Sequence, residues 1–176
     1  AFVTDLPELP RIAVCVVGLM GQQDENEIDM ITAACVIRSN FEGPANIMAI
    51  LANRFEDYGN GTLVGISSVA GERGRATNYV YGSAKGGFTT FLSGLRNRLA
   101  KSGVHVVTVL PGFVSTQMTE GLDLPPKLTA KPNEVADAIA RAVEQKKNVI
   151  YVRPIWRLIM LIIRTIPEQI FKGMKI

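Results

Sequence analysis

The stretch NYVYGSAKGG, residues 78–87, opens a long helical pattern and places a tyrosine and a lysine on one helix face. Tyr81 and Lys85 are four residues apart, so their side chains lie one turn apart on the same side of an α-helix. Glycine, alanine and serine fill the positions around them, and such small side chains leave space for a flat ligand. We therefore expect a helix over residues 79–101, ended by Gly103, with chemistry near its N-terminal end.

Short apolar runs alternate with helical patterns along the rest of the chain. The predicted strands are residues 12–17, 62–67, 104–110 and 149–152, and the other predicted helices are residues 25–58, bent near Gly43-Pro44, and 133–145, capped by Asn133. This order predicts an α/β fold in which a parallel sheet is covered by helices on both faces. A chain of 176 residues, of which 47% are hydrophobic, is sufficient for one such domain.

Small and polar residues follow three of the predicted strands. The segment GLMG, residues 18–21, follows the first strand, SSVAG, residues 67–71, follows the second, and PGFVST, residues 111–116, follows the third. In parallel sheets, ligands bind beyond the carboxyl ends of the strands. These three segments are therefore expected to form one site together with the face that carries Tyr81 and Lys85.

Taken together, these pieces resemble the short-chain dehydrogenase/reductase family. Ser68 stands thirteen residues before Tyr81 of the Tyr-x-x-x-Lys motif, and the Pro-Gly-x-x-x-Thr segment, residues 111–116, follows the next strand. Asn40 lies where the family places a helix asparagine. The resemblance covers nearly the whole chain and implies a Rossmann-like, doubly wound parallel sheet in three αβα layers. It also implies an NAD(P) cofactor and hydride transfer between a ketone and a secondary alcohol.

The chemistry of carbonyl reduction explains the residue types in this motif. Hydride transfer to a ketone leaves an alkoxide that needs a proton, and a free tyrosine, with a pKa of about 10, is poorly matched to neutral pH. We expect the Lys85 ammonium to lower the pKa of Tyr81, which then acts as acid or base. The Ser68 hydroxyl is suited to hydrogen-bond the substrate oxygen. By resemblance, Asn40 holds a water that links Lys85 to solvent, and these four are the catalytic residues.

The resemblance also implies which residues contact the nicotinamide end of the cofactor. Thr116 and the backbone near Val114 would bind the carboxamide, and Pro111-Gly112 would form a turn with no side chain to block the ring. The full set of cofactor-binding residues implied in this way is Gly18, Tyr81, Lys85, Pro111, Gly112, Val114 and Thr116.

Simpler interpretations of several residues stay open. Asn40 is alternatively a polar helix residue, Thr116 only a cap, Ser67 a strand-end hydroxyl, and Tyr79 a packing or cleft-lining residue. With two cysteines and one histidine, the chain offers no thiolate or multi-histidine metal site. One acidic cluster is interpreted as a solvated helix start rather than a metal site: Asp24, Glu25, Glu27 and Asp29.

One element of the family pattern has no counterpart in these 176 residues. It is the glycine-rich Thr-Gly-x-x-x-Gly-x-Gly turn, which binds the cofactor pyrophosphate at a helix N-terminus. The opening AFVTD, residues 1–5, resembles the end of the family's Asp-Val-Thr-Asp segment, with Phe2 in place of the aspartate that contacts adenine. We therefore expect the chain to lack the first strands of the fold. The strand over residues 12–17 is then expected to form an uncovered sheet edge.

The net charge of +3 is unevenly distributed along the chain. Residues 146–176 sum to +6, and residues 1–145 sum to −3. The predicted organisation is therefore the C-terminal two thirds of a Rossmann-type domain, residues 1–152, followed by a basic, apolar helical tail, residues 153–176.

The tail has the composition of a helix that lies on a membrane. Residues 155–163 are apolar except Arg157, and we expect Arg153, Arg157 and Arg164 to form one basic stripe. Such a helix is too short to span a bilayer but suits in-plane contact with anionic lipid. The alternative is a helix packed against the body of the protein or a partner subunit.

A narrower resemblance concerns the subgroup of decaprenylphosphoryl-2-keto-ribose reductases. The segment GERGR, residues 71–75, the Tyr81 motif and PGFV, residues 111–114, are similar to this subgroup. GLMG, residues 18–21, stands in place of the family's Asn-Asn-Ala-Gly, and the subgroup departs at the same place. The resemblance implies a lipid-linked keto-sugar as substrate.

Two hypotheses follow for the function of the chain. The first is an NAD(P)-dependent short-chain dehydrogenase/reductase that acts on an apolar or lipid-linked carbonyl. It would be a cytoplasmic homo-oligomer, peripheral on the inner face of the membrane, with no nucleic-acid partner. The alternative is a truncated, non-catalytic, membrane-associated remnant that cannot bind the dinucleotide.

Overall fold

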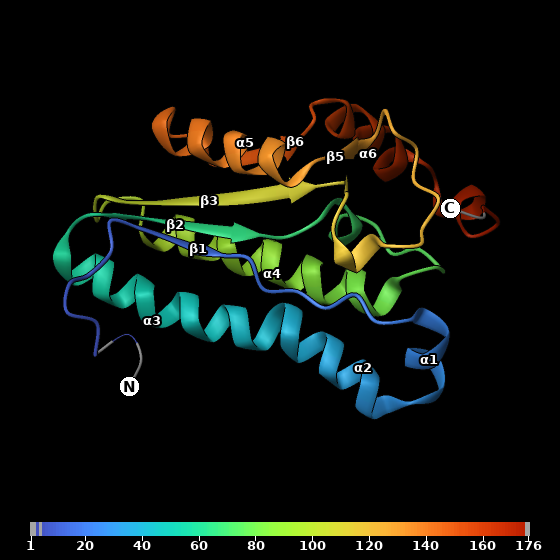
Figure 1. The fold of residues 1–176 in the computed structure, drawn as a ribbon, viewed down its shortest axis with the longest axis horizontal. Coiled ribbons are helices and arrows are strands. Elements are labelled where there is room, and N and C mark those ends of the chain that lie inside the picture. Colours follow the sequence, from blue (N-terminus) through green and yellow to red (C-terminus); the bar gives the residue numbers. More distant parts are fainter. Residues whose placement is uncertain (1–2, 4, 175–176) are drawn as a thin grey trace.

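Four parallel strands form the main sheet of the structure, a computed structural model that describes residues 3 and 5–174 (Figure 1). The sheet order is β1 (Ile12–Cys15), β2 (Gly61–Ile66), β3 (Val104–Pro111) and β6 (Val149–Val152), with every neighbouring pair parallel. The predicted parallel sheet is confirmed, and its strands are the four that were expected. The first strand is shorter than predicted, because it leaves the sheet after Cys15.

Helices lie on both faces of this sheet and enclose two apolar cores. The helices α3 (Gly43–Tyr58) and α4 (Tyr79–Arg98) cover one face, and α5 (Pro132–Glu144) covers the other (Figure 1). Successive side chains of a strand point to opposite faces. Leu63 of β2 therefore packs in the core beneath α3 and α4, whereas Val64 packs in the core beneath α5. The predicted three-layer α/β fold class is confirmed.

The long helical pattern over residues 25–58 is not one helix. It contains α1 (Gln23–Ile28), α2 (Met30–Ile37), a π-helical turn (Arg38–Glu42) and α3. The Asp29 carboxylate accepts a hydrogen bond from the Ile31 amide at 2.8 Å and so caps α2. The acidic cluster is thus exposed at helix starts, as expected. The bend expected near Gly43-Pro44 is the π turn that immediately precedes them.

Two predicted helix boundaries are wrong. Helix α4 ends at Arg98, and Gly103 lies beyond a further turn, at φ +74° just before β3. Helix α5 begins at Pro132 after Lys131, so Asn133 lies inside the first turn and not at the N-cap. Proline is favourable at the first helical position because the amide that it lacks has no partner there.

Glycines of α4 allow two backbone segments to touch. A Cβ on Gly86 would lie 2.8 Å from the carbonyl oxygen of Gly71, and one on Gly82 would lie 2.8 Å from that of Ala70. Both carbonyls belong to the 3-10 turn Val69–Gly71 that follows β2. The space that was expected to admit a flat ligand beside these glycines is therefore filled by the protein's own backbone.

Strand β1 is an edge strand with part of its apolar surface exposed. Ala13 and Cys15 pack against the core beneath α3, whereas Ile12 and Val14 are 47% and 44% exposed. Helix α5 packs over β3 and β6 and leaves these two side chains uncovered. The expected uncovered edge is confirmed. The interpretation of Phe2 lies outside the described residues.

The C-terminal residues form α6 (Ile155–Thr165) and the short helix α7 (Glu168–Phe171). Trp156 and Met160 of α6 are buried against Leu110 of β3, whereas Leu161 is 61% exposed. Packing of the tail against the body is therefore confirmed for one face of α6. Among the described residues, no helix is long and apolar enough to cross a membrane.

The basic stripe expected along this helix is wrong. Arg153 precedes α6, at φ +60°, and forms an ion pair with Glu134 at 3.0 Å. Arg164 is held by Glu72 at 3.1 Å, and Arg157 is exposed. The regular spacing of these arginines therefore does not produce one continuous charged face.

Replacing Gly86 by alanine should destabilise the protein, although alanine is the better helix former. The new Cβ would press on the Gly71 carbonyl, and we expect the free energy of unfolding to fall by about 1–3 kcal/mol. In the exposed part of the same helix, Gly94→Ala is the matched control, since a Cβ there meets nothing within 4 Å. It should raise the free energy of unfolding by about 0.5–1 kcal/mol. Urea unfolding followed by circular dichroism measures both, and equal shifts would contradict the close packing.

Candidate active site

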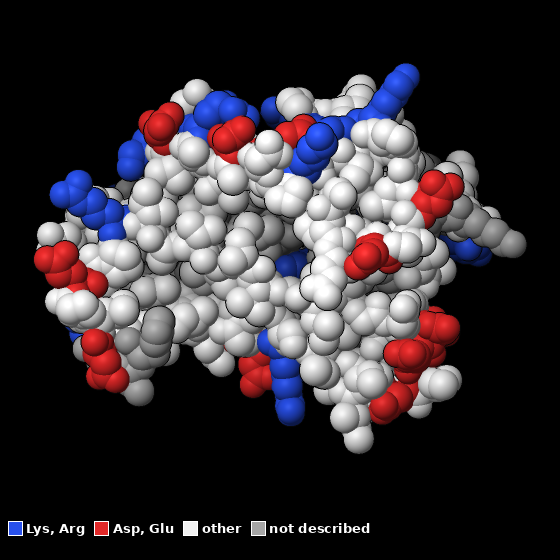
Figure 2. Space-filling model, in the orientation of Figure 1, with Lys and Arg blue, Asp and Glu red and all other residues white. Residues whose placement is uncertain are grey.

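A cleft of about 440 Å³ opens at the carboxyl ends of β1, β2 and β3. Figure 2 shows this face of the molecule hollowed near its centre, with atoms of a basic side chain at the bottom of the hollow. The catalytic candidate Ser68 lines the cleft together with every residue predicted to bind the cofactor: Gly18, Tyr81, Lys85, Pro111, Gly112, Val114 and Thr116. Asn40 does not line the cleft but contacts the segment that does.

Lys85 is the buried cation of the cleft. It projects from the second turn of α4, and only 3% of the residue is exposed. Its ammonium donates hydrogen bonds to the backbone oxygens of Ile66, at 3.1 Å, and Val17, at 3.4 Å. Burial lowers the pKa of Lys85 to about 8, because taking the ammonium out of water disfavours its charged form.

Asn40 is fully buried in the π-helical turn before α3. Its amide nitrogen donates to the carbonyl oxygens of Leu19, at 2.5 Å, and Val36, at 2.8 Å, and its amide oxygen accepts from the Leu19 N–H at 3.2 Å. Asn40 is therefore an internal clamp on the segment after β1. The clamp confines Gly18, because a Cβ there would lie 3.1 Å from the Asn40 oxygen and 3.3 Å from the Lys85 nitrogen.

Tyr81 and Ser68 meet across the cleft. Ser68 follows β2, and its hydroxyl accepts a hydrogen bond from the Ala70 amide at 3.1 Å, which begins the 3-10 turn. The Ser68 side chain lies close enough to the Tyr81 hydroxyl to lower the pKa of Tyr81. Burial has the larger effect and raises this pKa above its ordinary value of 10.

The expectation that Lys85 lowers the pKa of Tyr81 is wrong. The Lys85 nitrogen lies 5.8 Å from the centre of the Tyr81 ring and bonds to backbone oxygens instead. Because desolvation of the phenol dominates, Tyr81 keeps its proton at neutral pH. Tyr81 is therefore in the protonated form that a proton donor needs.

The residues beside the motif have different surroundings. Ser67 is buried and hydrogen-bonds the Lys85 carbonyl at 2.8 Å and the Thr89 hydroxyl at 2.7 Å, so it joins the end of β2 to α4. Its interpretation as a strand-end hydroxyl is confirmed. Tyr79 is exposed and lines a separate surface hollow rather than this cleft.

The segment after β3 packs against the tail. A Cβ on Gly112 would lie 1.8 Å from the Trp156 ring, so only glycine fits at this position. Phe113 contacts the same ring edge-on, with the ring centres 5.2 Å apart. The glycine that was expected to make room for the nicotinamide ring therefore makes room for a tryptophan of the protein itself.

Val114 and Thr116 continue this wall of the cleft. Val114 lies in β4 (Phe113–Val114), which pairs in parallel with β5 (Thr129–Ala130). Thr116 is the N-cap residue of the 3-10 turn Gln117–Thr119. Its alternative role as a cap is therefore present alongside its place on the cleft wall.

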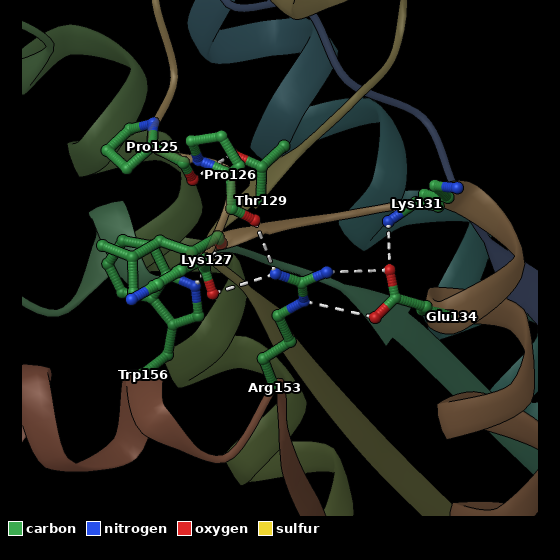
Figure 3. A network of polar contacts seen from close by, with 9 residues as sticks. Pro125, Pro126, Lys127, Thr129, Lys131, Glu134, Arg153 and Trp156 are labelled. Atoms are coloured by element: carbon green, nitrogen blue, oxygen red, sulfur yellow. Dashed lines mark hydrogen bonds and ion pairs between the residues drawn. The ribbon is translucent and has the colours of Figure 1, made fainter.

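A charged clamp holds the loop beside the cleft (Figure 3). Arg153 donates to both Glu134 carboxylate oxygens, at 3.2 and 3.0 Å, and to the backbone oxygens of Pro126 and Lys127, both at 2.9 Å. The Lys131 amide donates to the same carboxylate at 2.7 Å. The Arg153 hydrogen bonds hold the pKa of Glu134 below its ordinary value. The loop before α5 is thereby fixed against the end of β6.

Several residues that line the cleft had no role assigned from the sequence, and among them are Arg75, Asn78 and Trp156. Arg75 and Asn78 stand a few residues before Tyr81, and this nearness is the signal that could have found them. Trp156 is far away in the sequence and reaches the cleft only through the packing of α6.

Comparison with known proteins identifies the family. The family model described as short chain dehydrogenase matches residues 10–126, which include the Tyr81 motif. The chain belongs to the short-chain dehydrogenase family. An uncharacterized oxidoreductase of Mycobacterium tuberculosis is 37% identical over 162 residues, which are 92% of this chain and 65% of that protein. One of Streptomyces coelicolor is 33% identical over 155 residues, 88% of this chain and 61% of that protein. The chain thus spans less than two thirds of the length of these relatives.

Solved structures of this family share the fold at low sequence identity. A short chain dehydrogenase from Burkholderia cenocepacia in complex with NADP superposes with a TM-score of 0.79 and 21% identity over 92% of this chain and 67% of that chain. A short-chain dehydrogenase from Sphingobium yanoikuyae in complex with NADPH superposes with a TM-score of 0.74 and 22% identity, over 89% of this chain and 66% of that chain. The Rossmann-like fold is confirmed. The narrower reductase subgroup stays a prediction, and the non-catalytic alternative is not favoured.

The buried Lys85 ammonium makes stability depend on pH. Below about pH 8, Lys85 is charged in both the folded and the unfolded chain, and the folded state loses about 3 kcal/mol at roughly 1.4 kcal/mol per pKa unit. Between the folded pKa of about 8 and the ordinary value of 10.5, the unfolded chain binds more protons. Stability due to Lys85 therefore rises with pH across this window.

Lys85→Met removes this dependence. Relative to the native protein, its free energy of unfolding should fall by about 2–3 kcal/mol when the pH is raised from about 7 to about 10.5. Lys101→Met, at an exposed lysine, is the matched control and should show no such change. Urea unfolding at both pH values measures these free energies. If Lys85→Met differed from the native protein by the same free energy of unfolding at both pH values, the buried charge would be contradicted.

Proposed function

We propose that this protein is an NAD(P)-dependent oxidoreductase that interconverts a ketone and a secondary alcohol. The observation that carries the proposal is the meeting of Ser68, Tyr81 and Lys85 in one cleft at the strand ends. Membership in the short-chain dehydrogenase family and the likeness in fold to NADP-bound structures support it. We further expect a cytoplasmic homo-oligomer, as the family resemblance implies.

The residues of the cleft fit the nicotinamide end of a dinucleotide. Glycine at position 18 leaves the Lys85 ammonium open toward the cleft, because a Cβ there would lie 3.3 Å from it. Lys85 and Tyr81 would contact the nicotinamide riboside, and Thr116 and the Val114 backbone would contact the carboxamide. The glycine-rich pyrophosphate turn is not among the 176 residues, so this fit is argued for the nicotinamide end only.

The side chains of the cleft supply the proton and orient the reacting oxygen. When bound, the dinucleotide supplies the hydride. In reduction, Tyr81 donates its hydroxyl proton to the carbonyl oxygen as the hydride adds to the carbonyl carbon, and in oxidation it accepts this proton. Ser68 hydrogen-bonds the same oxygen, where negative charge develops. Because burial raises the pKa of Tyr81, the phenol carries the proton that reduction requires at neutral pH.

We further propose an apolar or lipid-linked keto-sugar as the substrate. Apolar side chains form much of the cleft wall: Met20, Val69, Phe113, Met118 and Trp156. The resemblance of residues 18–21 and 71–75 to reductases of polyprenyl-phosphoryl keto-pentoses supports this class of substrate. An apolar wall would accept the part of the lipid next to the sugar.

We propose that the exposed face of α6 contacts an anionic membrane surface. Four apolar side chains of this helix are between 43% and 61% exposed: Ile155, Leu158, Leu161 and Ile162. A nearby groove of about 630 Å³ has three basic side chains in its lining: Lys147, Arg157 and Arg164. Apolar residues beside basic ones favour the boundary of an anionic bilayer.

Tyr81→Phe tests the proposed chemistry. We expect turnover to fall by at least about a hundredfold, because general acid–base catalysis contributes roughly 10²–10⁴-fold. The assay follows NADPH oxidation with an apolar ketone, using the chain joined at its N-terminus to a glycine-rich strand–turn–helix of the family. Tyr79→Phe is the matched control and should retain activity. Undiminished turnover in Tyr81→Phe would overturn the assignment, and a lack of NADPH binding would favour the non-catalytic alternative.

Leu161→Glu tests the membrane contact. We expect the variant to lose most of its co-sedimentation with vesicles of phosphatidylglycerol and phosphatidylcholine, because a carboxylate is excluded from the apolar boundary. Ile31→Glu, at a position of α2 that is 82% exposed, is the control and should pellet like the native chain. Equal pelleting of both variants would reject the contact. Deletion of residues 153–176 is less suitable, since it removes Trp156 from the core.

A further inference from the structure

Arg75 is a cation of the cleft for which the described ion pairs include no carboxylate partner. Its Nε–H is buried and has no hydrogen-bond partner among the described residues. A second guanidinium nitrogen reaches only the sulfur of Met160, at 3.5 Å. A thioether is a weak acceptor, so the donors of Arg75 are largely unused.

The two neighbouring arginines have carboxylate partners of their own. Arg73 pairs with Glu168 at 2.7 Å and donates to three backbone oxygens at the end of α6. Arg164 pairs with Glu72, and the same carboxylate oxygen accepts from the Tyr151 hydroxyl at 2.8 Å. Arg73 and Arg164 thus each have a carboxylate partner, whereas the described ion pairs do not include the Arg75 guanidinium.

Glu72 acts on Arg75 without neutralising it. Its charge raises the pKa of Arg75, but burial has the larger effect and lowers it below the ordinary value. The loss of water around the Arg75 guanidinium therefore affects its pKa more than the nearby Glu72 charge does. A desolvated cation gains much from an anion that arrives with suitable geometry.

The lining of the cleft favours an anion over a cation. No Asp or Glu lines it among the described residues, whereas Arg75 and Lys85 both do. The Lys85 ammonium is bonded to the Ile66 and Val17 carbonyls, so Arg75 has the donors that remain for a ligand. A planar guanidinium binds phosphate and carboxylate oxygens in pairs.

The surroundings of Arg75 also limit the rest of the ligand. The Asn78 amide oxygen lines the cleft, is buried and has no hydrogen-bond partner among the described residues, so it is suited to accept from a hydroxyl. Phe113 and Trp156 form an apolar wall of the same cleft. A ligand that suits this cleft therefore combines an anionic group, a hydroxyl and an apolar portion.

We propose that Arg75 binds a phosphate or carboxylate group of the substrate and selects ligands that join this anion to an apolar body. The proposal rests on the proposed function because it places this ligand beside Tyr81. The binding that it describes needs no turnover and can be measured separately. Arg75 is thus a specificity-determining residue rather than part of the proton transfer.

The test measures binding to the 176-residue chain by calorimetry, with octyl phosphate, octanol, inorganic phosphate and NADPH as probes. Trp156 is the one tryptophan of the sequence and lines the cleft, so its fluorescence reports whether a probe binds there. We expect octyl phosphate to bind tighter than octanol or inorganic phosphate and to change this fluorescence. Arg75→Gln should weaken octyl phosphate by about tenfold or more, since hydrogen bonds to charged groups are lost. NADPH affinity should be unchanged in this variant.

Two further variants make the result decisive. Arg54→Gln removes an exposed arginine of α3 and should leave the affinity for octyl phosphate unchanged. Arg75→Lys keeps the charge beside Glu72 and should weaken binding less than Arg75→Gln does, which gives a result even where the glutamine variant folds poorly. Equal affinity of the native and Arg75 variants for octyl phosphate, or equal native affinity for octyl phosphate and octanol, would overturn the proposal. Neither outcome bears on turnover, which Tyr81→Phe tests independently.

Discussion

Burial of the Lys85 ammonium is the constraint around which the cleft is built. A buried charge is stable only when hydrogen bonds replace water, and Lys85 finds them at the carbonyls of Val17 and Ile66. The Ile66 carbonyl ends β2 and the Val17 carbonyl follows β1, and the parallel register places these two strand ends side by side. A slip of either strand by one residue would remove a partner and turn its side chains to the opposite face. The helix that carries Tyr81 is thereby tied to both strand ends.

Close backbone packing sets how far Ser68 lies from Tyr81. Ser68 begins the turn after β2, and Gly82 and Gly86 let this turn lie directly on α4 with no side chain between them. A Cβ at either glycine would push the helix away and separate the two hydroxyls. The small residues of the motif therefore position the reacting groups, which is a different role from making space for a ligand.

Sequence reasoning succeeded where the site depends on local pattern and parallel topology. Ser68, Tyr81 and Lys85 converge because carboxyl ends of neighbouring parallel strands meet at one edge of the sheet. The direction of the Tyr81 pKa shift was not predictable, since desolvation depends on the packing that covers the ring. The role of Arg153 was equally hidden, because its spacing matched a helix stripe, whereas it lies outside α6 and its partner, Glu134, lies 19 residues upstream in α5.

Helix α6 connects the cleft with the surface of the molecule. On one side, Trp156 forms part of the cleft wall and fills the space that Gly112 leaves, and on the other side Leu161 faces the exterior. Arg73 fixes the end of this helix through backbone oxygens and lies 3.9 Å over the Phe171 ring. The two faces are separated by about the 10 Å diameter of a helix. Under the proposed function, a lipid-linked substrate whose tail stays in the bilayer therefore needs only a short reach to place its head group in the cleft.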